Sequence, residues 1–132
     1  MIVVDTSAWI ELFRETGSPA NERLRALIHA QPAELAVTEV VVAEVMAGVP
    51  AAAVAATRGH VLRYRLLRLR GLRDYELAAL LARACREQGE AVRRLTDCLV
   101  AVPTIRAGAT LLHADRDFEK LARHTPLRLE PV

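Results

Sequence analysis

The sequence has few cysteines, so a hydrophobic core, and not disulfides or zinc, must stabilise the fold. Only two of its 132 residues are cysteines, Cys85 and Cys98. Two thiols cannot build a disulfide framework, and no further Cys or His lies near either of them at zinc-finger spacing. The longest stretch without a charge, Val45 to Thr57, is shorter than the roughly 20 apolar residues of a membrane span. The N-terminal residues show no signal-peptide pattern, and we therefore expect a cytoplasmic protein.

Lysine and aromatic residues are scarce as well. Lys120 is the single lysine, aromatic residues make up 4% of the chain, and the net charge is only +2. A charge this small does not by itself indicate a nucleic-acid-binding protein. Hydrophobic residues reach 52% and charged residues 26%, which excludes a disordered chain and fits one globular domain.

Short apolar segments alternate with helical patterns along the whole chain. Residues 2–4, 35–37 and 110–113 read as buried strands, and residues 65–72 and 127–129 as strands that are more exposed. For residues 65–72, a continuation of the preceding helix is the alternative. The segments between them have apolar residues at helical spacing, with capping residues before them and Gly or Pro after them. This alternation predicts an α/β fold with a central, mainly parallel sheet flanked by helices on both faces.

Five acids stand at informative places in this pattern: Asp5, Glu44, Asp97, Asp115 and Asp117. Each has an ordinary explanation, because the aspartates could cap helices or favour a first turn, and the glutamate could lie on an exposed helix face. Sites in open α/β sheets form at the carboxyl ends of the strands, however, and the expected fold brings several of these acids to that edge. We expect no neighbouring Lys or Arg to pair with them, except Arg116 beside the last two.

Carboxylates gathered at one edge repel one another, by about 4 kcal/mol for two charges ~4 Å apart at an effective dielectric of ~20. Such a cluster persists if a cation neutralises it or if some of its members stay protonated. An all-oxygen ligand set without His or Cys suits Mg²⁺ or Mn²⁺ better than Zn²⁺. The sequence therefore indicates a hard divalent cation at this edge.

Four segments, in order along the chain, carry a family resemblance. They are Val-Asp5-Thr-Ser7-Ala-Trp-Ile, Glu44 before Met-Ala-Gly48, Thr96-Asp97-Cys-Leu-Val-Ala, and Leu-Leu-His-Ala-Asp115-Arg-Asp117-Phe118. Each segment alone is weak, but the four together resemble a PIN-domain ribonuclease, and in particular the VapC toxins of type II toxin–antitoxin systems. The resemblance covers nearly the whole chain.

This resemblance implies a single three-layer PIN-like nuclease domain over residues 1–132. It also implies that the five acids form a catalytic, metal-binding pocket for Mg²⁺ or Mn²⁺, supported by the hydroxyl of Ser7 or of Thr6 beside it. The implied activity is endonucleolytic hydrolysis of RNA by a metal-activated water. The implied partners are the RNA substrate, a VapB-type antitoxin that inhibits the enzyme, and a second copy of the chain within a toxin–antitoxin assembly.

Three further features shape these expectations. Six arginines between Arg58 and Arg73, with no acid among them, form either an RNA-binding surface or an ordinary solvated face. Apolar residues of the first helix and of the helix bearing Glu44, including Trp9, Phe13 and Val41, predict a hydrophobic groove for the antitoxin. Pro103 lies in the helix after Asp97 and should remove one hydrogen bond there.

Two other functions fit the same elements. A nuclease of this fold could process RNA without any antitoxin, which the neighbouring reading frame would reveal. A catalytically inactive interaction module would keep the shape and lose the acids, whereas all five acids are present. A response-regulator receiver also clusters acids at strand ends, but Lys120 is not placed where a receiver needs its lysine.

Overall fold

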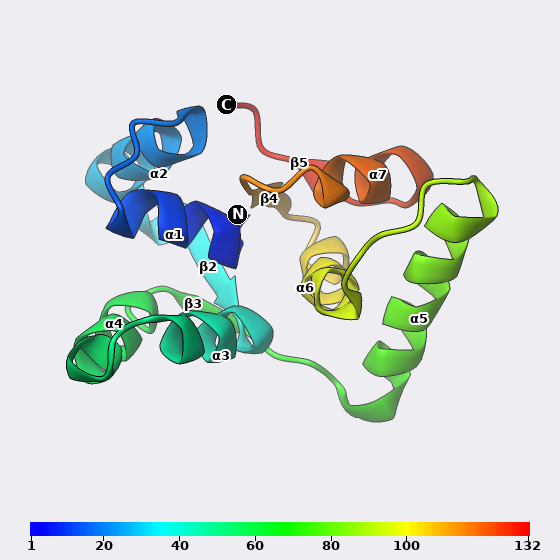
Figure 1. Ribbon diagram of the computed structural model, residues 1–132, viewed down its shortest axis with the longest axis horizontal. Helices are drawn as coiled ribbons and strands as arrows, with labels where there is room; N and C mark the ends of the chain where they lie inside the picture. The colour runs from blue at the N-terminus through cyan, green and yellow to red at the C-terminus, as the bar shows by residue number, and fades with distance from the viewer.

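The computed structural model describes residues 1–132 and contains one five-stranded sheet (Figure 1). The strands are β1 (Ile2–Val4), β2 (Leu35–Thr38), β3 (Arg65–Leu67), β4 (Thr110–Leu112) and β5 (Arg128–Leu129). Their spatial order is β3-β2-β1-β4-β5, and every neighbouring pair is parallel. Because β1 is the central strand and all five strands run the same way, their carboxyl ends lie at one edge.

Seven α-helices and two short 3₁₀ turns connect the strands. The helices are α1 (Thr6–Phe13), α2 (Pro19–Ala30), α3 (Glu39–Gly48), α4 (Val54–Val61), α5 (Gly71–Glu87), α6 (Leu95–Arg106) and α7 (Asp117–His124). The 3₁₀ turns are η1 (Pro32–Glu34) and η2 (Ala51–Ala53). Helices α1 to α4 pack as one group and α5 to α7 as another, and together they flank the sheet (Figure 1). The predicted α/β fold, with a parallel sheet flanked by helices, is confirmed.

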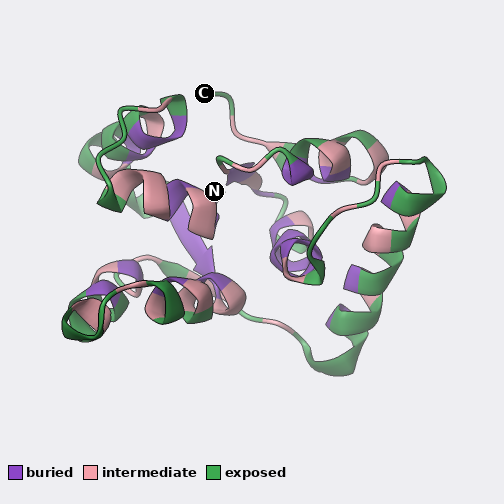
Figure 2. Cartoon of the chain, in the orientation of Figure 1, coloured by how far each residue is buried: buried purple, intermediate pink, exposed green.

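The core follows the apolar segments that the sequence shows. All residues of β1 and β2 are buried, and Leu111 and Leu112 of β4 are fully buried. Trp9 and Phe118 are the largest side chains in this core, and they come from the helices that follow β1 and β4. Purple segments in Figure 2 lie along β2 and on parts of the helices, while the outer turns are green. Strand β1 carries no polar side chain, and β2 carries one only at its last residue, Thr38. Polar side chains therefore collect at the carboxyl ends of these strands.

Several element boundaries differ from those that the sequence predicts. The strand expected over residues 65–72 ends at Leu67, because Leu69 N–H turns to donate to Glu39 Oε1 at 2.7 Å instead of extending the ladder. Helix α5 then begins at Gly71, where φ is +62°, a conformation that glycine adopts without strain. Asp74 lies inside the first turn of this helix and accepts a hydrogen bond from Arg70 N–H.

Pro103 is tolerated inside α6 because the middle of that helix is enclosed by the rest of the protein. Residues 97–104 are all buried, and the helix continues past the proline to Arg106. Thr104 Oγ1 donates to Val100 O at 2.8 Å, whereas the carbonyl that Pro103 deprives of its backbone donor is that of Leu99. Packing thus outweighs the hydrogen bond that proline removes.

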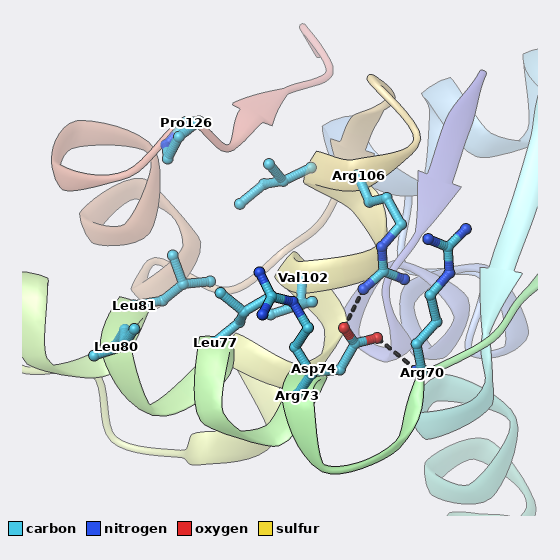
Figure 3. Close-up of a pocket in the computed structure, with 10 residues that line it drawn as sticks. Arg70, Arg73, Asp74, Leu77, Leu80, Leu81, Val102, Arg106 and Pro126 are labelled. Atoms are coloured by element: carbon cyan, nitrogen blue, oxygen red, sulfur yellow. Dashed lines mark hydrogen bonds and ion pairs between the residues drawn. The ribbon is translucent and has the colours of Figure 1, made fainter.

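A buried carboxylate joins α5 to α6 beside a cavity of about 480 Å³ (Figure 3). Asp74 is only 1% exposed, and it accepts hydrogen bonds from Arg70 N–H and from the Arg106 guanidinium. Burial raises the pKa of Asp74, but these two hydrogen bonds more than offset that effect, so the pKa lies below its ordinary value. The ionised carboxylate is therefore the form that holds the two helices together.

We predict that Asp74→Ala lowers the free energy of unfolding by about 1–3 kcal/mol, because it leaves Arg70 N–H and Arg106 without their acceptor. The matched control is Glu76→Ala, two residues further along the exposed side of α5, which should change stability by less than about 0.5 kcal/mol. Urea unfolding of the two variants measures the difference. Equal stabilities would show that the Asp74 pair contributes nothing.

Candidate active site

Asp5 stands at the point where the central strand ends. Its backbone N–H donates to Leu112 O at 2.9 Å, which extends the pairing of β1 with β4 by one residue. Its side chain caps α1: Oδ2 accepts from Ser7 N at 2.9 Å and from Ser7 Oγ at 2.6 Å. The carboxylate is nevertheless buried, 4% exposed, and burial raises the pKa of Asp5 to about 6, against the opposing hydrogen bonds from Ser7. The negative charge of Glu44 raises it further.

Two hydroxyl groups fix the neighbouring parts of the site. Ser7 Oγ, besides donating to Asp5, accepts from Ala114 N–H at 2.9 Å, so it links the end of β1 to the segment after β4. Thr6 Oγ1 donates to Glu44 Oε1 at 2.8 Å and holds that side chain of α3 beside the start of α1. The sequence leaves open whether Ser7 or Thr6 supports the acids. In the structure both do, because Ser7 binds Asp5 and Thr6 binds Glu44.

Asp97 lies in the first turn of α6 and is the least satisfied carboxylate of the protein. It is 3% exposed, and its Oδ2 atom is buried without any hydrogen-bond partner. Burial raises the pKa of Asp97 to about 7; the positive charge of Arg94 lowers it, and the negative charges of Asp5, Asp115 and Glu44 raise it. These mutual effects bring four of the five predicted acids into one electrostatic cluster.

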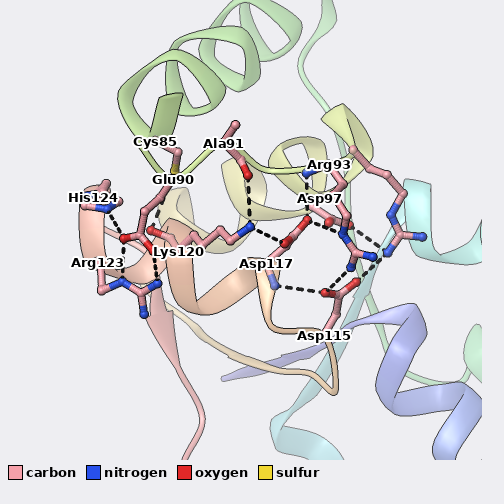
Figure 4. Close-up of polar contacts among 11 residues, drawn as sticks. Cys85, Glu90, Ala91, Arg93, Asp97, Asp115, Asp117, Lys120, Arg123 and His124 are labelled. Carbon is pink, nitrogen blue, oxygen red and sulfur yellow. Dashed lines mark hydrogen bonds and ion pairs between the residues drawn. The ribbon is translucent and has the colours of Figure 1, made fainter. Parts of the chain in front are cut away.

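Asp115 and Asp117 follow β4 and are paired with basic side chains (Figure 4). Asp117 Oδ2 accepts from Arg93 N at 2.8 Å and from Arg93 Nε at 3.1 Å, and its Oδ1 lies 3.1 Å from Lys120 Nζ. Although burial raises the pKa of Asp117, these partners lower it to about 2. Asp115 Oδ1 accepts from Arg93 Nη2 at 3.0 Å, and its Oδ2 accepts from Arg94 Nη2 at 2.7 Å. Both oxygens of each of these two acids are thus engaged by cations.

The expectation that only Arg116 would pair with these acids is wrong. Arg116 makes no ion pair, whereas Arg93, Arg94 and Lys120 do. Arg94 is three residues before Asp97, and Lys120 is three residues after Asp117. Side chains at this spacing lie on the same face of a helix, so the sequence contains a signal for both pairs. Arg93 reaches Asp117 only because the loop between α5 and α6 folds back toward α7, which no local pattern reveals.

The cluster has the chemistry of a hard-cation site. All five acids offer oxygen, and the orphaned Asp97 Oδ2 is a buried acceptor that a cation would satisfy. No three Asp, Glu, His or Cys side chains are arranged here to hold one ion between them. Since Asp115 and Asp117 are engaged by Arg93, Arg94 and Lys120, they would have to exchange a partner for the ion.

A groove of about 440 Å³ runs between α1 and α3, directly beside Glu44. Its lining residues are Ile10, Phe13, Arg14, Glu44, Val45, Gly48, Val49 and Pro50. The sequence predicts a groove at this place, but part of the expected lining is wrong: Trp9 and Val41 are fully buried in the core. The Trp9 ring packs against His60 and Tyr64. Phe13 is 40% exposed and stacks on Trp9 at a ring-centroid distance of 5.8 Å.

Comparison with known proteins identifies the family to which this fold belongs. The family model described as PIN domain matches residues 2–124. VapC ribonuclease Mb1587 of Mycobacterium bovis is 38% identical over 134 residues, covering 97% of this chain and 96% of that protein. Ribonuclease VapC11 of Mycobacterium tuberculosis matches to the same extent. The solved structure of VapBC2 from Rickettsia felis, bound to a DNA fragment from its promoter, superposes with a TM-score of 0.71 at 20% identity and covers 98% of each chain.

The α/β fold and the acidic edge of the sheet therefore define a PIN-type domain. The chain belongs to the PIN domain family and, within it, to the VapC proteins. The resemblance seen in the four sequence segments is confirmed at the level of the family. No helix of the chain is long and apolar enough to cross a membrane.

We predict a pH signature for Asp97, whose folded-state pKa of about 7 lies above the ordinary value of 3.8. A raised pKa contributes stability below pH ~4, and this stability is lost as the pH rises through about 7. Asp97→Asn mimics the uncharged form, so in EDTA its melting temperature should exceed that of the parent by a few degrees at pH 8.

The quantity to measure is the difference in melting temperature between the parent and Asp97→Asn at pH 4 and at pH 8. Taking this difference cancels the titration of His60 and His113, whose pKa values are lowered by burial and act in the opposite direction. A difference that does not change between the two pH values contradicts the raised pKa of Asp97.

Proposed function

We propose that the protein is a metal-dependent endoribonuclease that acts as the toxin of a type II toxin–antitoxin system. The observation that carries this proposal is the group of buried, mutually repelling carboxylates Asp5 and Asp97 at the carboxyl edge of the sheet. Membership of the VapC proteins supports it, because the two related proteins described above are named ribonucleases. The cytoplasmic location expected from the sequence is part of the same proposal.

The cation proposed for this site is Mg²⁺ or Mn²⁺, held by Asp5 and Asp97, with Glu44, Asp115 and Asp117 completing the site. When bound, such an ion supplies an activated water and a positive charge for the phosphate and leaving oxygen. Asp5 is presented by the end of β1 and held by Ser7. Asp97 is presented by the first turn of α6, with its free Oδ2 inside the cluster. Asp5 is therefore held by hydrogen bonds before substrate arrives, which reduces the reorganisation needed during the reaction, while Asp97 keeps a free acceptor for the cation.

Glu44 is the acid best placed to orient the attacking water. It is half-buried on α3, and Thr6 Oγ1 binds only one of its oxygens, Oε1. The second oxygen has no side-chain partner, so it can accept a proton of the water or bind a second cation. Thr6 limits the movement of the carboxylate and thereby aims this second oxygen.

RNA needs positive charge around an acidic pocket. The six arginines from Arg58 to Arg73 are all exposed, and none of them takes part in an ion pair. A groove of about 500 Å³ follows the backbone from Arg65 to Arg70 and is also lined by residues near the C-terminal end of α6: Pro103, Arg106 and Ala107. Charges left unpaired over such a length favour a phosphate backbone as their partner. We propose this stretch as the RNA-binding surface.

We predict that the protein cleaves RNA in Mg²⁺ or Mn²⁺ and not in EDTA, and that Asp97→Asn lowers the rate at least 100-fold. The asparagine keeps the shape of the side chain but removes the charge that would hold the cation. Glu87→Gln, an exposed acid at the end of α5, is the matched control and should cleave like the parent. Cleavage of a fluorescent single-stranded RNA gives the rates. Full activity of Asp97→Asn, or activity in EDTA, would refute the proposed mechanism.

The inhibitor that we propose is a VapB-type antitoxin seated in the groove between α1 and α3. The R. felis relative was solved as a VapBC assembly, which supports a partner of this kind. An apolar groove that ends at Glu44 fits a segment with apolar side chains and a basic residue at its tip. Such a residue would pair with Glu44, Asp5 or Asp97 and block the approach of a cation and of RNA. A dimer of two such complexes is the assembly that we expect.

We predict that the product of the adjacent small gene co-purifies with this chain and abolishes RNA cleavage. Val49→Glu, which puts a charge into the groove, should weaken this complex at least tenfold while the free enzyme still cleaves RNA. Leu72→Glu, at a 74% exposed position on α5, is the control and should bind like the parent. If Val49→Glu binds the partner as tightly as the parent, the groove between α1 and α3 is not the binding site. If no partner co-purifies, an RNA-processing nuclease without antitoxin becomes the favoured function.

A further inference from the structure

Arg94 lies between Asp115, which it shares with Arg93, and Asp97, which has no other basic partner. Its Nη2 atom lies 2.7 Å from Asp115 Oδ2 and 3.8 Å from Asp97 Oδ1. It is the only basic residue that contacts Asp97, whose other oxygen, Oδ2, is buried without a partner. One guanidinium nitrogen thus provides positive charge to carboxylates from two elements, α6 and the segment after β4.

The neighbouring Arg93 is held in a different way. Its backbone N–H and its Nε both donate to Asp117 Oδ2, and its Nη2 donates to Asp115 Oδ1. Release of the Arg93 guanidinium would therefore break side-chain bonds to two different aspartates, Asp115 and Asp117. Arg94 is attached only through the end of a long side chain that is 54% exposed, so its guanidinium can leave while its backbone stays at the start of α6.

We propose that Arg94 competes with a divalent cation for Asp97 and Asp115, and that Arg94, once displaced, binds a phosphate of the RNA. This inference rests on the proposed function. A cation at these carboxylates repels the guanidinium at short range, while an RNA phosphate beside the cation attracts it. A guanidinium fork matches two phosphate oxygens. Because Arg94 is anchored one helical turn from Asp97, the displaced side chain stays beside the acids, where the scissile phosphate must lie.

The first measurement is the affinity for Mn²⁺ by isothermal titration calorimetry. Arg94→Gln removes the competing charge, so it should bind Mn²⁺ about two- to fivefold more tightly than the parent, the range expected for a half-exposed ion pair. Arg94→Lys keeps the charge and should bind Mn²⁺ like the parent. Arg86→Gln, an exposed arginine on α5 that makes no ion pair, controls for the general change in net charge.

The second measurement is the binding of a fluorescent single-stranded RNA in Ca²⁺, followed by anisotropy over a range of KCl concentrations. The loss of one phosphate contact should weaken binding by Arg94→Gln and reduce the slope of log affinity against log salt by about 0.7. Arg86→Gln should keep the slope of the parent. If Arg94 had a purely structural role, Arg94→Gln would not bind Mn²⁺ more tightly and would not change this slope.

The outcomes separate this inference from the proposed function. If the parent binds Mn²⁺ and cleaves RNA while Arg94→Gln equals the parent in both measurements, only the role of Arg94 is refuted. Tighter Mn²⁺ binding with an unchanged salt slope refutes the transfer to phosphate, and weaker Mn²⁺ binding refutes the competition. If the parent itself binds no Mn²⁺, both the proposed function and this inference fall.

Discussion

The parallel pairing of β1 with β4 is the constraint on which the rest of the structure depends. It aligns Val4 with Leu112, and the N–H of Asp5 continues the ladder by one bond. The first polar residue after each strand is therefore delivered to the same edge, and Ser7 joins the two segments through Asp5 and Ala114 N–H. Helices α1 and α7 both start from this point, so their positions follow from the register of the two strands.

The acids at this edge divide into two kinds according to their partners. Asp117 is surrounded by Arg93 and Lys120, which lower its pKa to about 2, and it ties the α5–α6 loop to α7. Asp5 and Asp97 are equally buried, but Asp5 has no basic partner and Asp97 has only Arg94, at 3.8 Å. Burial therefore raises their pKa values to about 6 and about 7. Two buried carboxylates with raised pKa values lower the free energy of unfolding at neutral pH, where they ionise. A divalent cation bound between them would explain why the protein keeps them.

Much of the fold could be predicted from the sequence because buried parallel strands are continuous apolar runs and their ends carry polar residues. The same logic predicts that Asp5 and Asp115 lie near one another, whereas Glu44 and Asp97 lie on helices and join them through the family resemblance; all four interact electrostatically. The pairing of Arg93 with Asp117 could not be predicted, because it depends on the path of a loop between two distant helices. The sequence places Trp9 in the antitoxin groove, whereas it is fully buried against His60 and Tyr64. These partners come from a later part of the chain, so the apolar spacing on α1 does not show them.

The central claim is that Asp97 is a buried carboxylate whose charge is balanced by a divalent cation. Carbon-13 NMR of the aspartate carboxyl groups, titrated from pH 3 to pH 9 with and without Mg²⁺, tests it most directly. The account predicts that Asp97 titrates near pH 7 in EDTA and that saturating Mg²⁺ moves its midpoint down by more than about one pH unit, since the cation favours the ionised form. An Asp97 carboxyl that titrates at an ordinary pH for aspartate and does not respond to Mg²⁺ would contradict it.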